Sequence, residues 1–144
     1  MRLFLKRIFG SLPSFKKDSR RHHTPHLSSE QVNTLVRQLD ELMEQKRPYL
    51  KESYNLKSLA DELKIQQYQL SAFLNHELGV NFNDYLNKRR VRYCEELIHA
   101  GDAHRLNLKG LASKCGFHNR NTFTTAFKKF TGSTPSDYTR RHRA

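Results

Sequence analysis

A pattern of helix, break and helix occurs twice in the chain at a nearly constant separation. Leu59-Ala60 recurs as Leu111-Ala112, displaced by 52 residues, and Leu70 recurs as Phe123, displaced by 53. The further matches are Ile65 with Phe117, Leu74 with Phe127, Gly79 with Gly132, and Asp84-Tyr85 with Asp137-Tyr138. The second copy has one additional residue in its turn. A unit repeated with its apolar spacing intact predicts two copies of one helical subdomain.

Length and composition favour one small helical protein. The 144 residues are enough for about one domain, and 36% hydrophobic residues supply a modest core. No Trp, 6 Gly and 4 Pro are too few turn-forming residues for a sandwich or barrel of short strands. The two cysteines, Cys94 and Cys115, are too few for a disulfide framework and lack the spacing of metal ligands. We expect both to lie in the core of a protein from a reducing compartment.

Apolar periodicity predicts the helices that carry the repeat. Spacings of three and four residues mark helices at 28–47, 56–64, 67–77 and 83–100. Ser28 and Gln31 have the spacing of a capping box, and Pro48 ends the first helix. We therefore expect an all-α fold in which two helix-turn-helix subdomains are joined by a long central helix and preceded by one extra N-terminal amphipathic helix. The apolar stripe of that first helix is expected to be covered by the following domain, the alternative being the equivalent helix of a partner.

Charge is distributed unevenly along the chain, which has a net charge of +12. Residues 1–27 carry 7 basic and 1 acidic side chains, residues 28–63 carry 5 and 7, and residues 64–144 carry 14 and 6. The predicted organisation is a basic flexible segment at 1–27, an amphipathic linker helix at 28–50 and a basic domain at 51–144. Within that domain we expect subdomain one at about 51–82, the central helix at about 83–100 and subdomain two at about 105–142. Such a balance favours polyanionic partners.

The segment at residues 1–27 has several interpretations. No run in it reaches the ~20 apolar residues of a membrane span, and Lys6-Arg7 interrupts what would be a signal-peptide core. It is predicted to be a disordered start, with two alternatives: an amphipathic segment on an anionic membrane surface, or a stub beside the membrane in a longer receptor. His22, His23 and His26 are interpreted as part of a solvated tail rather than as a metal site.

The second helix of each repeat presents polar residues opposite its buried face. Helix-turn-helix proteins place this helix in the major groove of DNA. The candidates for reading base edges are Gln67, Tyr68, Ser71, Ala72 and Asn75 in the first copy, and Arg120, Asn121, Thr124 and Thr125 in the second. Arg pairs with guanine, Asn and Gln pair with adenine, and Tyr, Thr and Ala meet the thymine methyl group. The competing interpretations are an ordinary surface position for Tyr68 and a phosphate contact for Arg120, while Asn119 is expected to be a helix cap.

Basic residues flank both candidate recognition helices. The candidates for phosphate contacts are Lys88, Arg89, Lys128, Lys129, Arg140 and Arg141, with Arg143 beyond them. On the central helix, Lys88, Arg89 and Arg92 are expected to point outward. Such contacts supply salt-dependent affinity without sequence information. Catalytic arrangements such as Cys-His, Ser-His-Asp, paired carboxylates or a phosphate loop are absent from the sequence, so we expect no enzymatic activity, no cofactor and no metal.

A string of residues across 51–142 resembles the DNA-binding domain of AraC/XylS-type transcription factors. The residues that carry the resemblance are Leu56-Lys57-Ser58-Leu59-Ala60, Gly79-Val80-Asn81-Phe82, Tyr85, Arg90-Val91, Leu97, Leu111-Ala112, Gly116-Phe117, Phe123, Phe127-Lys128, Gly132, Thr134-Pro135-Ser136 and Tyr138. Gln66 and Ala72 depart from the family, which commonly has Ser at the first recognition-helix cap and, in many members, Arg at the second position. The amino-acid sequence at residues 70–75 and 81–87 is similar to that of the branch of the family that is fused to membrane-bound or periplasmic sensors.

The resemblance implies seven helices in two helix-turn-helix subdomains, whose recognition helices enter two successive major-groove segments. It implies a bacterial, cytoplasmic transcription regulator that binds double-stranded DNA sequence-specifically, with RNA polymerase as a further partner and no catalysis. On the location, the cytosolic side of the membrane is the alternative. On function, the alternative is a non-specific basic protein that binds nucleic acid or membrane surfaces, for which the net charge of +12 is a sufficient cause. Paired recognition faces favour the specific reader.

Overall fold

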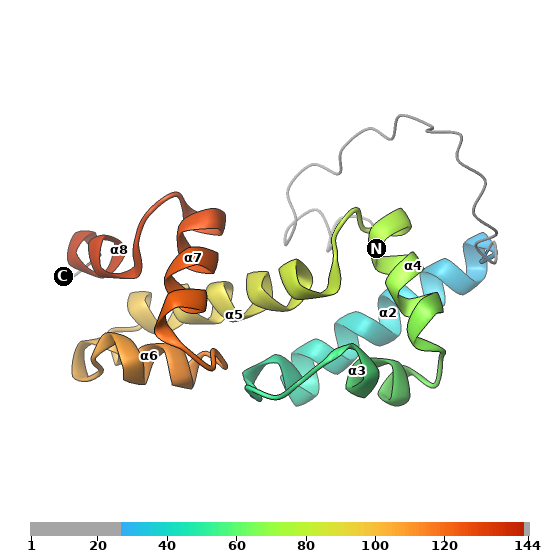
Figure 1. Cartoon of the computed structure of the whole chain (residues 1–144), viewed down its shortest axis with the longest axis horizontal. Helices are drawn as coiled ribbons and strands as arrows, with labels where there is room; N and C mark the ends of the chain where they lie inside the picture. The colour runs from blue at the N-terminus through green and yellow to red at the C-terminus, as the bar shows by residue number, and fades with distance from the viewer. Residues whose placement is uncertain (1–26, 143–144) are drawn as a thin grey trace.

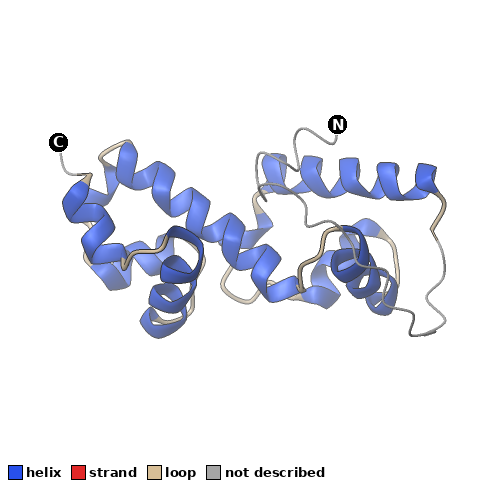
Figure 2. Cartoon of the chain, turned by 90° about the horizontal axis from the view of Figure 1, so that it is seen from above, coloured by secondary structure: helices blue, strands red, loops and turns tan. Residues whose placement is uncertain are grey.

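The computed structural model describes residues 27–142, and every regular element within them is helical (Figures 1 and 2). In chain order these elements are α2 (Ser29–Lys46), the 3-10 helix η1 (Pro48–Leu50), α3 (Leu56–Leu63), α4 (Gln67–Glu77), α5 (Phe82–His99), the 3-10 helix η2 (Asp102–Arg105), α6 (Leu108–Lys114), α7 (Arg120–Thr131) and α8 (Pro135–Arg141). The predicted all-α fold is confirmed. The interpretations of the segment at 1–27 fall outside the described residues, apart from Leu27, and so does the predicted phosphate contact of Arg143.

Two hydrophobic cores form along α5, and this helix contributes to both. Tyr85 and Leu86, near its start, pack with buried residues of α2, α3 and α4. Val91, Cys94 and Ile98 pack with buried residues of α6 and α7. Figure 1 shows α5 running from one group of helices into the other. The two helix-turn-helix units are therefore joined by a packed helix rather than by a free linker.

The sequence repeat is also a repeat of local hydrogen bonds. The first helix of each copy begins at an asparagine whose side chain accepts a backbone hydrogen bond, and each turn closes with the same backbone bond. These contacts are Asn55 Oδ1 from Ser58 N–H (3.0 Å), Asn107 Oδ1 from Gly110 N–H (2.7 Å), Ala60 O from Ile65 N–H (3.0 Å) and Ala112 O from Phe117 N–H (2.9 Å). Equivalent caps and turns hold the second helix of each copy in the same local frame.

Helix α2 packs into the first core. Its apolar stripe is buried, with exposed fractions of 7% for Leu35, 1% for Leu39 and 0% for Met43. The expected capping box is present, because Ser28 N–H donates to Gln31 Oε1 (2.8 Å) and Gln31 N–H donates to Ser28 Oγ (3.2 Å). The stripe is thus covered by the same chain, as predicted.

The prediction that Arg89 points outward is wrong. Arg89 is 5% exposed and lies between α5 and α2, where its Nη2 contacts Asp40 Oδ1 (2.7 Å) and its Nη1 contacts Glu44 Oε1 (3.2 Å). Burial lowers the pKa of Arg89, but Tyr85 and Asp40 beside it more than compensate, so its pKa lies above the ordinary value. α2 covers this face of α5 and supplies the carboxylates, so Arg89 is unavailable to phosphate.

Both cysteines lie in the second core, as predicted, and both are fully buried and free. A hydrogen bond with Cys115, together with burial, raises the pKa of Cys94. A thiol with a raised pKa carries little of the thiolate form that acts as a nucleophile.

Candidate nucleic-acid interface

Helix α4 presents a polar face on the side away from the first core. Leu70, Phe73 and Leu74 are buried beneath it. The structure places the five predicted residues together on the opposite face, with Gln67, Tyr68 and Asn75 exposed and Ser71 and Ala72 partly exposed. Spacings of one, three and four residues give this common face. Tyr68, 63% exposed, stands out because it is the one large apolar side chain exposed among the described residues.

Local hydrogen bonds order the two ends of the α4 face. At the amino end, Gln66 N–H donates to Gln69 Oε1 (3.1 Å), so a glutamine pair replaces the serine cap that the family commonly has. In the last turn, Asn75 Nδ2 donates to Ser71 O (2.8 Å) and to Ser71 Oγ (3.4 Å). The amide nitrogen of Asn75 is thus engaged within the helix, and its carbonyl oxygen is the atom left for a base edge.

Helix α7 presents the corresponding face in the second copy. Phe123, Ala126 and Phe127 are buried. Arg120, Asn121 and Thr125 are exposed and Thr124 is partly exposed, so the structure also brings these four predicted residues together. Asn119 Oδ1 accepts a hydrogen bond from Thr122 N–H (2.8 Å), which confirms the interpretation of Asn119 as a helix cap.

The two polar faces match position by position. The displacement of 53 residues pairs Gln67 with Arg120, Tyr68 with Asn121, Ser71 with Thr124 and Ala72 with Thr125. In Figure 1 the chain runs upward through both α4 and α7, which stand beside the start of α5 and beside its later part. The two helices thus carry matching faces in two units that share α5, and two matching faces suit two contacts with a periodic ligand.

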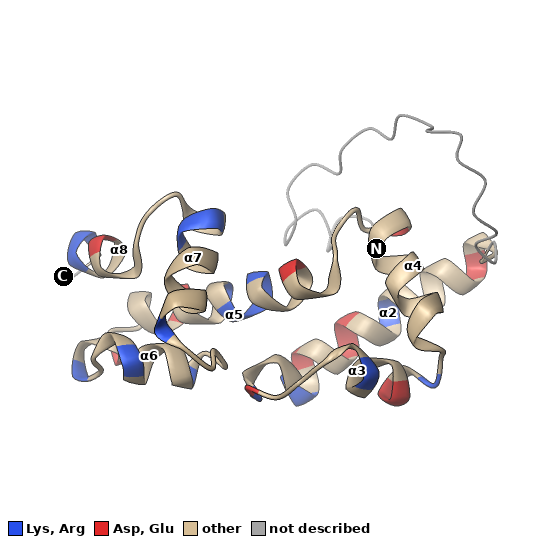
Figure 3. Cartoon of the chain, in the orientation of Figure 1, with Lys and Arg blue, Asp and Glu red and all other residues tan. Residues whose placement is uncertain are grey.

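Charge differs between the two helix-turn-helix units, which we call the two heads (Figure 3). α4 contains neither Lys nor Arg, whereas α7 has Arg120 at its start and Lys128 and Lys129 in its last turn. Lys128 is exposed. Lys129 is also exposed, but its Nζ contacts both carboxylate oxygens of Asp84 at 2.8 Å, so it also ties α7 to the first turn of α5. A phosphate would have to compete with Asp84 for this lysine.

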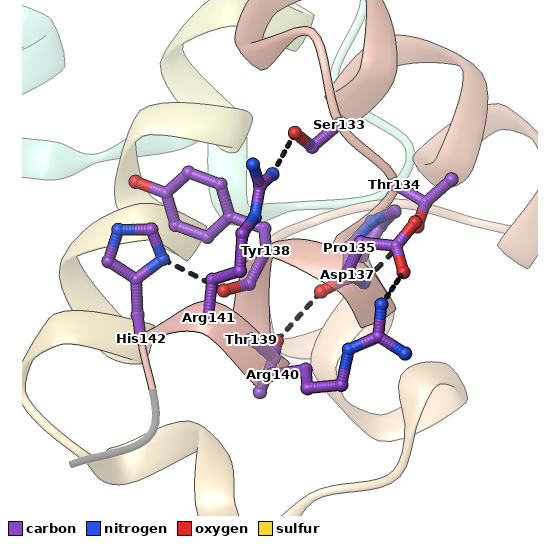
Figure 4. A network of polar contacts seen from close by, with 9 residues as sticks. All are labelled: Ser133, Thr134, Pro135, Asp137, Tyr138, Thr139, Arg140, Arg141 and His142. Carbon is purple, nitrogen blue, oxygen red and sulfur yellow. Dashed lines mark hydrogen bonds and ion pairs between the residues drawn. The ribbon is translucent and has the colours of Figure 1, made fainter.

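The arginines of α8 are held by one residue of the helix and one residue of the turn that precedes it (Figure 4). Arg140 Nη2 contacts Asp137 Oδ1 at 2.7 Å, and Arg141 Nη2 donates to Ser133 Oγ. Asp137 is in turn held by Thr134, whose hydroxyl donates to Asp137 Oδ2 (2.7 Å). Each guanidinium has five N–H donors, so these contacts orient it and leave donors for an anion.

Lys88 is half-buried at the side of α5. Its ammonium lies 6.0 Å from the ring centre of Phe130, the aromatic residue near the end of α7. Burial lowers the pKa of Lys88, and the positive charge of Arg92 lowers it further. The side chain borders a hollow of about 440 Å³ that Arg92, Glu95, His99 and Phe130 also line.

Within residues 27–142, no group of three or more His, Cys, Asp or Glu side chains is placed to hold a metal ion. No helix of that same part of the chain is long and apolar enough to cross a membrane.

Sequence reasoning missed two residues that bond segment 47–52 to other elements of the fold, Arg90 and Glu52. Both bond to partners that are 39 or more positions away in the sequence. One signal in the sequence was available: Gly116 stands where the first copy has Lys64, although the neighbouring apolar positions match. A glycine at one position of a repeat marks a close approach of backbone or a left-handed conformation.

Comparison with known proteins finds similarity to helix-turn-helix proteins. A family model described as a helix-turn-helix domain matches residues 59–141. The uncharacterized HTH-type transcriptional regulator YijO of Escherichia coli K12 is 32% identical over 124 residues, which are 83% of this chain and 42% of that protein. The chain therefore spans less than half the length of this curated relative.

Solved structures share the fold. A probable AraC family transcriptional regulator from Rhodopseudomonas palustris CGA009 aligns with a TM-score of 0.65 at 21% identity, covering 77% of this chain and 99% of that one. The DNA-binding domain of AdpA, solved in complex with a target DNA, aligns with a TM-score of 0.62 at 19% identity, covering 76% and 92%.

Proposed function

Because the chain belongs to the AraC-type helix-turn-helix family, we propose that it binds double-stranded DNA sequence-specifically and regulates transcription. The observation that carries this proposal is the pair of matching polar faces on α4 and α7, each backed by its own hydrophobic core. Each helix enters one of two successive major-groove segments. A protein that acts on bacterial DNA in this way works in the cytoplasm.

The two faces read bases with different chemistry. Arg120 pairs with guanine, Asn121 and Gln67 pair with adenine, and each good bidentate pair contributes about 1–3 kcal/mol of discrimination. Tyr68, and the methyl groups of Ala72, Thr124 and Thr125, contact thymine methyl groups. Ser71 and the carbonyl oxygen of Asn75 complete the first face.

Phosphate affinity is assigned to the second subdomain and the central helix. Lys88, Lys128, Lys129, Arg140 and Arg141 supply it, and Arg89 is excluded by its burial. Lys129 and Arg140 exchange their carboxylate partners for phosphate on binding, so their net contribution is smaller than that of Lys128. The phosphate contribution to DNA affinity falls as the salt concentration rises, because binding releases counterions from the DNA.

A selection of bound sites from random duplex DNA, with the purified chain at two salt concentrations, tests the proposal. Enrichment of two short boxes about one helical turn (~10 bp) apart is the expected result. A single box would mean that α4 only supports α7. No enrichment, with affinity that collapses as salt rises, would instead identify a non-specific polyanion binder, the alternative that the net charge of +12 favours.

A matched pair of variants separates base reading from phosphate contact. Arg120→Ala removes a cation at the start of α7, and Lys128→Ala removes one in its last turn. We expect Arg120→Ala to relax the preference at one base pair of one box. Lys128→Ala should weaken all sequences alike and reduce the slope of affinity against salt by about 1. Unchanged base preferences in Arg120→Ala would make its role a phosphate contact.

We propose two further partners. The family resemblance implies contact with RNA polymerase, which retention of polymerase on promoter DNA by the purified chain would test. The basic, partly apolar sequence of residues 1–27 fits an anionic membrane surface. Deletion of residues 1–27 should then abolish binding to anionic vesicles, and unchanged vesicle binding would reject that role.

A further inference from the structure

The residues that follow α2 pack against the turn of the second helix-turn-helix unit. We call this contact the seam, formed by segment 47–52 on one side and residues 113–118 on the other. Gly116 lies at its centre, because a Cβ atom there would be 2.3 Å from Tyr49 O and 2.9 Å from Leu50 Cα. Two stretches of backbone from different halves of the sequence therefore meet with no room for a side chain.

Arg90 fixes the seam from the side of α5. Its Nε donates to Tyr49 O (2.7 Å) and its Nη2 donates to Lys51 O (3.0 Å). Its guanidinium carbon lies 5.6 Å from the ring centre of Phe117. Arg90 is 7% exposed, and a buried guanidinium with these partners holds segment 47–52 in one position on α5.

Glu52 closes the seam at its solvent side. Ser113 Oγ donates to Glu52 Oε1 (3.0 Å), and His118 Nδ1 lies 3.4 Å from Glu52 Oε2. Ser113 belongs to α6, and His118 lies two residues before the start of α7. A residue that follows α2 in subdomain one is therefore bonded to both sides of the second turn.

The first copy of the repeat has no glycine at the equivalent position. Lys64 occupies it, exposed, with a φ of 57°, where Gly116 has a φ of 88°. Both copies thus use the left-handed conformation, but only the second turn has a glycine, which accommodates segment 47–52. The two copies of the repeat therefore differ at the seam, and the glycine of the second copy allows the second unit to pack against the first.

We propose that the seam fixes the pose of α7 relative to α4 and thereby sets the spacing between the two DNA boxes, with Glu52 as a specificity-determining residue that contacts no base. The inference rests on the proposed two-headed DNA binding. A change of one base pair in the spacer moves one box by about 3.4 Å along the helix axis and turns it by about 35°. Two heads held at a fixed relative pose cannot follow such a change, whereas heads free at the seam can.

The test measures affinity for a series of duplexes that keep both selected boxes and change only the spacer. Wild-type chain, Glu52→Ala and a control, Asp61→Ala, are compared. Both variants remove one acidic side chain, so both change the net charge equally, but Asp61 contacts Lys57 within α3 and does not reach the seam. Wild type and Asp61→Ala should lose about tenfold or more in affinity when the spacer changes by one base pair. Glu52→Ala should lose about threefold or less.

A second variant guards against misfolding of the first. Ser113 is exposed on α6, and Ser113→Ala removes the hydroxyl that donates to Glu52. The spacing tolerance of this variant should lie between those of wild type and Glu52→Ala. Equal spacing profiles in wild type and in the folded seam variants would overturn the proposal while leaving the two-headed function intact. Selection of one box only by wild type would overturn both. Broader tolerance in the seam variants alone supports it.

Discussion

Replacing Gly116 with alanine should destabilise the protein more than the same change at Gly132. The two positions separate the effect of backbone strain from the effect of a steric clash. Both glycines have a left-handed backbone, with φ of 88° at Gly116 and 79° at Gly132. A Cβ at Gly132 would meet nothing within 4 Å. At Gly116 it would lie 2.3 Å from Tyr49 O and 3.0 Å from Arg90 Nε. Gly132→Ala is therefore a control for backbone strain alone.

The expected magnitudes follow from these contacts. A left-handed conformation costs a residue with a Cβ about 1–2 kcal/mol, which is the whole effect at Gly132. At Gly116 the new atom also has to displace backbone, and overpacking of this kind typically costs about 1–3 kcal/mol. We therefore expect Gly116→Ala to lower the free energy of unfolding by about 2–5 kcal/mol, and Gly132→Ala to lower it by about 1–2 kcal/mol.

Urea denaturation followed by far-UV circular dichroism measures both values. The difference between the two variants isolates the close approach at the seam, since the backbone term is common to both. A difference below about 0.5 kcal/mol would refute the reasoning, because it would mean that Tyr49 and Gly116 are not packed against each other in solution.

Three further predictions concern other parts of the molecule. Arg89→Ala should lower the free energy of unfolding by about 3 kcal/mol in the same assay, because it leaves the partly buried Asp40 without its partner, and it should leave the salt dependence of DNA binding unchanged. Tyr68→Ala should leave thermal stability within about 0.5 kcal/mol of wild type, since the side chain is 63% exposed, yet weaken binding to the selected site in a gel-shift titration; unchanged affinity would remove Tyr68 from the interface. Lys64→Gly should stabilise the protein by about 0.5–1 kcal/mol, because it relieves a left-handed lysine at φ 57°; a loss of stability would show that the lysine side chain contributes more than the strain.

Local signals in the sequence were sufficient to locate the main helices. α4 occupies the predicted residues 67–77, and α2 and α5 differ from their predicted ranges by one residue at each end. Their bounds are set by neighbouring residues, such as the asparagine cap of α5 and the proline after α2, which act over three or four positions. The polar faces of the two recognition helices follow from the same short-range periodicity.

Contacts between distant segments left no comparable signal. Arg89 lies on α5 beside two residues that the pattern also placed outside, Lys88 and Arg92, and its burial depends on where α2 packs, 45 and 49 positions earlier. A charged residue is expected at the surface unless its counter-ions are known. The base and phosphate roles of the site residues stay predictions, because they depend on a ligand that the sequence does not contain.

Because α5 belongs to two cores, the reading heads are not interchangeable modules. The buried side chains of α5 up to Leu86 complete the first core, those from Val91 onward complete the second, and the partly buried Tyr93 packs against both. A hybrid regulator in which the second unit is exchanged at the end of α5 would keep the α5 side chains that packed in the core of the unit it lost. The workable junction lies in the few residues between Leu86 and Val91, and a transplanted head would have to keep the contacts that Tyr93 and Arg90 make with the other unit.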